Sequence, residues 1–282
     1  MQLIDDPEVM ANWAKKRRRG VETVALVPTM GALHAGHLTL IKLARMHADE
    51  VVVSLFVNPI QFGEAKDFTH YPRKLEQDLM QCEALGVDVL FAPSADRVYM
   101  KDTSVWVDEE LLSRGLCGES RPGHFRGVCT IVLKLLNLVQ PDLAVFGEKD
   151  LQQLRIIERM VRDLNIPVEI LRGKTVRESD GLAMSSRNQR LSEGARLDAV
   201  VIYESIQGAK KQVEQGERSV EVLIQAVRDR LVCLPRIVID YVVVVDDVTL
   251  KPIERIHSTA LLAIAVKLES IRLIDNDVLR RS

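Results

Sequence analysis

The segment that most constrains the fold runs from residue 24 to residue 57, where two apolar, β-branched runs flank an amphipathic pattern. The first run, residues 24–27, breaks at Pro28, and the second, VVVSLFV, occupies residues 51–57. Between them, apolar residues recur at helical spacing, at positions 38, 41, 44 and 48. A strand, a tight turn, a helix and a second strand in this order predict a βαβ unit.

Two histidines lie in the turn of this unit. His34 and His37 are three residues apart near the expected start of the helix, so both side chains can lie on one face, where backbone N–H groups point outward. Gly31 and Gly36 allow the backbone to approach a bulky anion, and an imidazole N–H can donate to phosphate oxygens. Two histidines that only cap a helix are the alternative, but the flanking glycines after a buried strand favour a phosphate site.

Uncharged polar residues follow the next strand. Asn58 and Gln61, in the segment NPIQF, come directly after residues 51–57. Because the carboxyl ends of parallel strands meet at one edge of a sheet, both side chains are expected beside the histidine turn, as donors facing a ligand crevice. Ordinary turn formation by Asn-Pro is the alternative.

The segment GEKDLQQL repeats this arrangement after an expected strand at residues 143–146. Lys149 is placed to meet phosphate, and Asp150 can cap a helix or bind a ribose hydroxyl or a metal. Gln153 lies one turn inside the expected helix and faces the same edge. A solvated lysine and a simple helix cap are equally compatible with this segment taken alone.

Two further segments combine turn residues with charge. After an expected strand at residues 168–171, the loop RESDGLAMSSRNQRLS includes Ser185, Ser186 and Arg187, whose hydroxyls and guanidinium suit a polyphosphate, although a Ser-rich linker has the same composition. The motif RPGHFRG, residues 121–127, is typical of a mobile flap or an interface loop.

These patterns predict an α/β protein. Residues 1–175 are expected to form a Rossmann-like parallel-sheet domain, and residues 176–282 a smaller α+β domain. Further elements are predicted as helices at 74–85, 128–139, 192–215 and 220–232 and as strands at 87–93, 237–245 and 260–268.

Composition excludes several classes of protein. The chain is 47% apolar and 28% charged, with 38 basic and 40 acidic residues well mixed, so it has no broad positive field for a nucleic acid. The one basic cluster, residues 15–19, is interpreted as a solvated helix end. No apolar run has the length of a membrane span and residues 1–20 do not resemble a signal peptide, so we expect a cytoplasmic protein without membrane partners. The four cysteines show no zinc or disulfide spacing.

Five of these segments together resemble one family. PTMGALHAGH, FVNPIQF, RPGHFRGV, FGEKDLQQL and GLAMSSRN occur in the order and approximate spacing of pantothenate synthetases, and the resemblance extends over nearly the whole chain. The HxGH turn and the MSSR loop are also similar to the paired nucleotide-binding signatures of class I aminoacyl-tRNA synthetases and related nucleotidyltransferases.

The resemblance implies a two-step reaction. ATP, with Mg²⁺, would activate the carboxylate of pantoate as a pantoyl adenylate with release of pyrophosphate, and the amine of β-alanine would then displace AMP to give pantothenate. A homodimer is implied as well. Two other functions stay open: a nucleotidyltransferase that keeps the nucleotide on its product, and a non-catalytic adenine-nucleotide sensor or RNA-binding relative.

The resemblance also implies roles for the domains and for individual residues. Residues 1–175 would bind ATP and pantoate, and residues 176–282 would cover the active site. His37 would assist adenylate formation with His34 beside it, and Lys149, Ser185 and Arg187 are counted with them as catalytic. Pantoate and β-alanine would be bound by Asn58, Gln61 and Gln153. ATP would contact Met30, Gly31, Ala32, Leu33, His34, Ala35, Gly36, His37, Gly147, Glu148, Lys149, Asp150, Val176, Met184, Ser185, Ser186 and Arg187.

Neutral amides suit the first step of this reaction. The pantoate carboxylate has to attack phosphorus, and a glutamine orients it without the strong ion pair that would blunt the nucleophile. The metal ligands are undetermined, with Asp78 and Asp150 as candidates. Three positions depart from the family pattern: Ala35 stands where an acidic residue is frequent, Leu151 where an aromatic one is expected, and Cys129 where a small or hydroxyl residue is common.

Overall fold

The computed structural model describes residues 1–17, 20, 22–62 and 68–281, and the chain divides into two compact units. The first unit comprises Met1–Glu148 and Gln153–Lys174, and the second comprises Lys149–Gln152 and Thr175–Ser282. Each unit is described by itself below.

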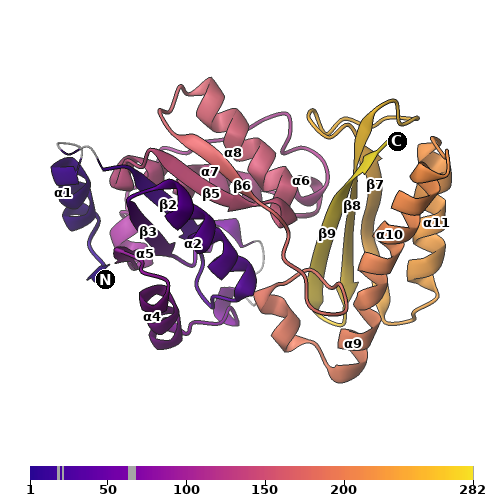
Figure 1. The fold of residues 1–282 in the computed structure, drawn as a ribbon, viewed down its shortest axis with the longest axis horizontal. Coiled ribbons are helices and arrows are strands. Elements are labelled where there is room, and N and C mark those ends of the chain that lie inside the picture. Colours follow the sequence, from indigo (N-terminus) through magenta and orange to yellow (C-terminus); the bar gives the residue numbers. More distant parts are fainter. Residues whose placement is uncertain (18–19, 21, 63–67, 282) are drawn as a thin grey trace. The chain divides into compact units, whose positions relative to one another are not determined.

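The first unit is built on a six-stranded parallel sheet in the order β1-β4-β3-β2-β5-β6. Its strands are β1 (Gln2–Ile4), β2 (Val24–Thr29), β3 (Glu50–Leu55), β4 (Val89–Phe91), β5 (Leu143–Gly147) and β6 (Glu169–Gly173). Its helices are α1 (Pro7–Arg17), α2 (Ala35–His47), α4 (Leu75–Ala84), α5 (Ala95–Val98), α6 (Cys117–Ser120), α7 (His124–Val139) and most of α8 (Leu151–Asp163), with the short 3₁₀ turn η1 (Pro59–Gln61). A second 3₁₀ turn, η2 (Glu148–Asp150), lies where the chain passes into the second unit, to which residues 149–152 belong. The predicted α/β fold with a parallel sheet is confirmed (Figure 1).

Helices cover the sheet on both faces. α2 packs on β2, β3 and β5, and Ile41 and Ala44 of this helix are fully buried with Cys82 of α4 in the same core. α7 packs against β2, and α1 packs against α7. α7 is buried around most of its circumference, as its nearly uniform apolar sequence predicts. Strands enclosed in this way need the continuous Val- and Leu-rich runs that marked β2 and β3 in the sequence.

The strand order reverses between β2 and β5. From β2 the chain proceeds through β3 to β4 on one side, whereas β5 and β6 lie on the other side of β2. Loops at such a reversal separate as they leave the sheet, which is why ligands of open α/β sheets bind there. The loop after β2 carries the histidines, and the loop after β5 carries the segment GEKD.

The second unit consists of an antiparallel sheet, β7-β8-β9, packed by helices. Its elements are η3 (Ser186–Arg190), α9 (Glu193–Asp198), α10 (Val200–Glu214), α11 (Val220–Val232), β7 (Ile237–Val245), β8 (Thr259–Leu268) and β9 (Ile271–Arg280). Its core joins buried residues of α10 and α11 to the sheet, among them Ile202, Ile206, Leu223, Leu231 and Ile264.

The structure differs from the sequence-based expectation at several elements, and α7 begins at His124, before the expected start at residue 128. β1 and β9 were not predicted, because β1 has only three residues and β9 interleaves apolar residues with Arg272, Asp275 and Asp277. The helix expected at residues 192–215 is divided into α9 and α10, which meet at Ala199.

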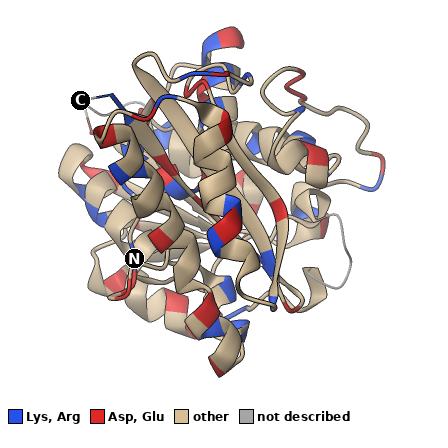
Figure 2. Ribbon diagram, turned by 90° about the vertical axis from the view of Figure 1, so that its right-hand side faces the viewer, with Lys and Arg blue, Asp and Glu red and all other residues tan. Residues whose placement is uncertain are grey.

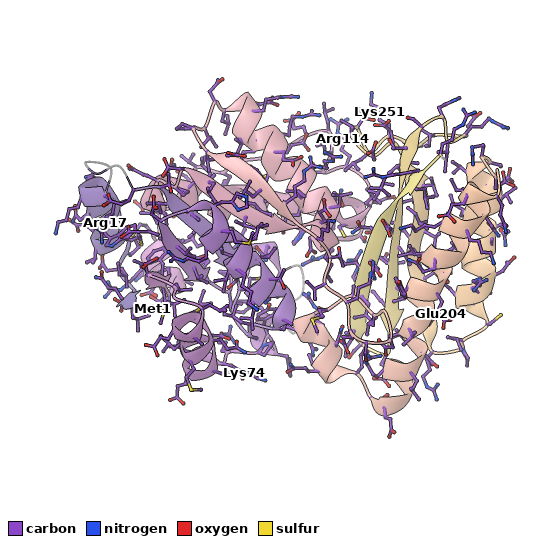
Figure 3. All side chains as sticks on the ribbon, viewed as in Figure 1. Met1, Arg17, Lys74, Arg114, Glu204 and Lys251 are labelled. Carbon is purple, nitrogen blue, oxygen red and sulfur yellow. The ribbon has the colours of Figure 1, made fainter. Side chains whose placement is uncertain are left out.

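Charges of both signs are interspersed along the ribbon (Figure 2). Within the basic cluster, Arg17 ends α1 (Figure 3). Its guanidinium pairs with Glu50 at 2.9 Å and lies over the ring of Trp13. Arg18 and Arg19, which belong to the same predicted cluster, lie outside the described residues. In the described part of the chain, no helix has both the length and the apolar character needed to cross a membrane.

Candidate active site

The turn after β2 adopts a strained backbone. Gly31 and Ala32 both have left-handed φ angles, 79° and 51°. For alanine this region costs about 1–2 kcal/mol, so other contacts must hold it. Thr29 Oγ1 provides one, since it donates to the carbonyl oxygen of Ser54 at 2.8 Å and accepts the N–H of Gly31 at 3.1 Å. The end of β2 is thereby tied to β3.

Asp78 provides a second anchor for this turn. It extends from α4, the helix that follows Lys74 (Figure 3), and is only 2% exposed. Its Oδ2 accepts the N–H of Ala32 and its Oδ1 accepts the N–H of Leu33, both at 2.8 Å. Burial raises the pKa of this carboxyl group, and the two hydrogen bonds oppose that rise. Each oxygen of Asp78 thus accepts an N–H group of the turn, which supports a role for this carboxylate in holding the turn.

His34 and His37 lie at the start of α2 and form a capping box. His34 Nδ1 accepts the N–H of Gly36 at 3.2 Å, and His37 Nδ1 accepts the N–H of His34 at 3.3 Å. The two ring centroids are 4.0 Å apart. Because Nδ1 accepts in both rings, each neutral imidazole carries its proton on Nε2. Capping and phosphate binding are therefore compatible: the caps orient two Nε2–H donors at a helix N-terminus.

Asn58 and Gln61 follow β3, at the 3₁₀ turn η1, and both are buried. The exposed fraction is 1% for Asn58 and 8% for Gln61. Asn58 Nδ2 donates to Gln61 Oε1 at 3.1 Å and to the carbonyl oxygen of Gly127 at 3.0 Å. Gln61 Nε2 is 2.8 Å from Met30 Sδ. The structure thus brings the predicted substrate glutamine next to the first residue of the predicted ATP turn.

The loop after β5 forms the single turn η2, and α8 begins at Leu151, directly after Asp150. Gly147 is the last residue of β5 and pairs with Gly173 of β6. Gln153 lies in the first turn of α8 and is partly buried. Lys149 and Asp150 belong to the second unit, and Lys149 Nζ lies 4.0 Å from Asp150 Oδ2. The backbone carbonyl oxygen of Lys149 accepts a hydrogen bond from Asn276 Nδ2 at 2.7 Å.

The loop predicted to bind phosphate, residues 184–187, lies in the second unit and is held by hydrogen bonds within that unit. Met184 N–H donates to the carbonyl oxygen of Val176 at 3.0 Å, next to a short antiparallel bridge between Arg177 and Ala183. Ser185 caps η3, and its Oγ accepts the N–H of Arg187 at 3.2 Å. Val176 and the MSSR segment are thereby brought together.

A magnesium ion has few candidate ligands on this chain. Among the described residues, no three His, Cys, Asp or Glu side chains are grouped as a metal site. Asp150 is half exposed and keeps carboxylate oxygens of the type that Mg²⁺ prefers, whereas Asp78 is committed to the turn. A magnesium ion held chiefly by phosphate oxygens and water, with Asp150 nearby, fits this donor set.

The family model of pantoate-beta-alanine ligases matches residues 2–278, nearly the whole chain. The chain belongs to this family. It therefore belongs to the enzymes that join pantoate to β-alanine, and the family resemblance of its sequence motifs is confirmed.

Relatives agree along their full length. The pantothenate synthetases of Heliobacterium modesticaldum and Fervidobacterium nodosum are each 50% identical to the chain, with 99% of the chain and 99% of each relative covered. The pantothenate synthetase from Thermus thermophilus, known from a crystal structure, is 41% identical in sequence to this chain. The match covers 98% of this chain and 99% of the Thermus chain, with a TM-score of 0.93. The ligase from Francisella tularensis, complexed with β-γ ATP and β-alanine, is 33% identical, with a TM-score of 0.81 and coverage of 99% and 97%.

The sequence did not reveal several contacts that shape the site. Asp78 was proposed as a metal candidate, although its helical position gave no sign of its contact with a turn more than forty residues earlier. Arg121 and His124 belong to the motif predicted as a mobile flap or an interface loop, and the contact of both with Gln61 was not predicted. Tyr99, which donates to Asn58 Oδ1 at 3.0 Å, was not identified. Only tertiary packing reveals these contacts.

Proposed function

We propose that the chain activates pantoate with ATP as a pantoyl adenylate and then transfers the pantoyl group to β-alanine. In the first step a pantoate carboxylate oxygen bonds to the α-phosphorus and pyrophosphate leaves. In the second step the amine of β-alanine bonds to the carbonyl carbon, loses a proton, and AMP leaves. Family membership supports the overall ligation, and the Francisella complex, which holds an ATP species and β-alanine, supports the use of ATP.

The observation that carries the proposed mechanism is the orientation of His34 and His37. Both rings direct their acceptor nitrogen to backbone N–H groups, so each has a proton on Nε2 at the N-terminus of α2. Donors fixed in this way stabilise the charge that develops on phosphate oxygens in the transition state and need no reorganisation. A neutral imidazole also donates without attracting the pantoate carboxylate as an imidazolium would.

Other residues have supporting roles in this proposal. Gln61 and Gln153 orient pantoate, with Asn58 beside Gln61, while the segment Met30–His37 and the loop 147–150 contact ATP. Val176 and residues 184–187, with the hydroxyl of Ser185 and the guanidinium of Arg187, bind ATP and its phosphates, and Lys149 adds a positive charge. Mg²⁺, held by phosphates and Asp150, would neutralise polyphosphate charge.

The proposal also includes features beyond the reaction. Residues 1–175 are proposed as the domain that binds ATP and pantoate, and residues 176–282 as a smaller α+β domain. A cytoplasmic homodimer without a nucleic-acid partner is part of the proposal and rests on the family resemblance together with the balanced charge of the chain. The molecular mass of the protein in solution, measured by light scattering, tests whether the chain forms a dimer.

An isotope experiment distinguishes the proposed intermediate from its alternatives. The purified chain is incubated with ATP, Mg²⁺, β-alanine and pantoate labelled with ¹⁸O in its carboxylate. The adenylate route transfers one label to AMP, because the carboxylate oxygen that attacked phosphorus leaves with it. ADP and labelled inorganic phosphate would indicate an acyl phosphate instead. A product that retains the nucleotide would indicate a nucleotidyltransferase, and no turnover would favour a sensor.

A further inference from the structure

The motif RPGHFRG has no role in the function proposed above, yet the structure connects it to Gln61. Arg121 Nη2 donates to the carbonyl oxygen of Gln61 at 3.0 Å, and His124 Nδ1 lies 2.8 Å from the same oxygen. A carbonyl oxygen only accepts, so Nδ1 of His124 carries a proton. Arg121 Nη1 lies 3.2 Å from His124 Nε2, and since arginine only donates, Nε2 accepts. Two side chains of one motif, with a neutral histidine, thus hold one backbone oxygen.

The glycine of the same motif completes the contact. A Cβ atom on Gly127 would lie 2.9 Å from the backbone nitrogen of Gln61 and 2.9 Å from the carbonyl carbon of Ile60. Glycine therefore lets the first turn of α7 approach the backbone of η1 more closely than any other residue would permit. The backbone of Gln61 is therefore held by the hydrogen bonds of Arg121 and His124 and by direct packing against the first turn of α7.

Asn58 determines how the Gln61 side chain is turned. The carbonyl oxygen of Gly127 can only accept, so it fixes the amide nitrogen of Asn58 on its side, and the same nitrogen donates to Gln61 Oε1. Tyr99 donates its hydroxyl to Asn58 Oδ1, and burial raises the pKa of Tyr99 to about 12, which keeps that proton in place. With Oε1 of Gln61 engaged, its Nε2 is the atom directed toward Met30.

We propose that Arg121, His124 and Gly127 of the RPGHFRG motif, together with Asn58, form a positioning unit that presents Gln61 to pantoate as a hydrogen-bond donor. The inference rests on the proposed assignment of Gln61 to pantoate and adds the residues that orient it and the polarity of the contact. An unrestrained glutamine could turn either its oxygen or its nitrogen to the substrate. The positioning unit removes that choice, so the pocket selects an acceptor oxygen, either a carboxylate oxygen or an acceptor hydroxyl of pantoate.

Variants of the motif test this proposal through the Michaelis constants of the separate substrates. His124→Ala and Arg121→Ala should each raise KM for pantoate about tenfold to a hundredfold, since small displacements of a positioning group have effects of this size, while KM for ATP changes little. His124→Asn should restore most of the affinity, because its Nδ2 can donate from nearly the position of Nδ1, whereas His124→Gln should not. Gln61→Glu, which replaces the donor by an acceptor, should raise KM for pantoate at least as much.

Arg126→Ala is the matched control, since Arg126 belongs to the same motif but is exposed and lies over Trp106. It should leave both Michaelis constants unchanged. Equal KM values for pantoate in His124→Asn and His124→Gln would overturn the role of His124, and a normal KM in Gln61→Glu would overturn the donor assignment. Asn and Gln variants that both unfold would make His124 a residue of stability alone, which also contradicts the proposal. Failure of the wild-type chain to bind pantoate in calorimetry would instead refute the proposed function.

Discussion

At the level of single residues, the proposed mechanism depends on the two histidines at the start of α2. Replacing His37 by alanine removes the Nε2–H donor and one half of the capping box. We expect kcat for pantothenate formation to fall roughly 10²–10³-fold, the effect of losing one preorganised donor to a transition-state charge, with the fold retained. Steady-state kinetics and circular dichroism measure the two effects separately.

His47→Ala is the control for this substitution. His47 is the last residue of the same helix and is exposed, with its Nδ1 3.0 Å from the carbonyl oxygen of Leu43. Its removal should leave kcat within about twofold of the wild type. A folded His37→Ala variant with full turnover would contradict the role assigned to His37.

Asp78 gives a second prediction for a single residue. In Asp78→Asn one oxygen becomes an amide nitrogen, which cannot accept a backbone N–H, so the strained turn at Ala32 loses an anchor. KM for ATP should rise about tenfold, since the lost bond to a charged acceptor represents roughly 1.5–3 kcal/mol. The dependence of the rate on Mg²⁺ concentration should stay unchanged, and a requirement for much more Mg²⁺ would instead support Asp78 as a metal ligand. Cys82→Ala, a change to a buried residue on the same helix, is the control.

The direction of the pKa shift predicts how Asp78 responds to acid. Its pKa is raised in the folded state, so as pH falls the folded protein takes up this proton before the unfolded chain does, and protonation adds to the free energy of unfolding. The ionised form is the one that accepts two N–H groups. KM for ATP should therefore rise on acidification before the protein unfolds, a pH dependence that Asp78→Asn should lack.

Among the secondary-structure elements, the close approach of α7 to η1 is the feature most sensitive to substitution. Gly127→Ala would place Cβ 2.9 Å from backbone atoms of η1, and backbone moves less readily than a flexible side chain. We expect the free energy of unfolding to fall by about 1–3 kcal/mol, as for overpacking in a core. Denaturant titration monitored by circular dichroism measures it.

Gly208→Ala is the matched control, because Gly208 also lies inside a helix, α10, but the atoms nearest to its Cβ would be those of the Arg230 guanidinium, at 3.4 Å, the far end of a flexible side chain. That change should be neutral or stabilise by up to about 1 kcal/mol, because alanine is the better helix former. Equal effects of the two substitutions would show that α7 does not constrain η1.

Elements could be predicted from the sequence where burial is continuous. β2, β3 and α7 were predicted because strands and helices enclosed on all sides require long apolar runs, and these are visible in one dimension. β9 was missed because Asp275 and Asp277 interrupt its apolar pattern, although Asp275 is in fact buried against Arg177. The break between α9 and α10 at Ala199 was missed because alanine carries no signal for a helix end.

The candidate site, like the fold, could be predicted only where a local sequence pattern determines the geometry. Residues within one turn, such as His34 and His37, could be grouped because their spacing fixes their geometry. Contacts between distant segments, such as Asp78 with Leu33 or His124 with Gln61, depend on how helices pack on the sheet, and no local pattern encodes that packing. The sequence therefore identified the groups suited to the chemistry but not those that position them.

For the molecule as a whole, the cysteines report on the integrity of the core. Cys82 and Cys129 are buried, and burial raises the pKa of each thiol to about 12, whereas Cys233 is exposed. At pH 8 the two buried thiols should have roughly a thousandfold smaller thiolate fraction than an ordinary cysteine. Iodoacetamide should modify Cys233 first, as peptide mass spectrometry would show. Rapid modification of Cys82 or Cys129 in the native protein would contradict the packing of the first unit.

Pyrophosphate exchange tests whether the whole molecule forms pantothenate through a pantoyl adenylate. The purified chain is mixed with ATP, Mg²⁺, labelled pyrophosphate and pantoate, without β-alanine. We predict that label enters ATP only when pantoate is present, because adenylate formation is reversible, and that AMP accumulates once β-alanine is added. Exchange that does not depend on pantoate, or AMP release that does not depend on β-alanine, would contradict the adenylate mechanism.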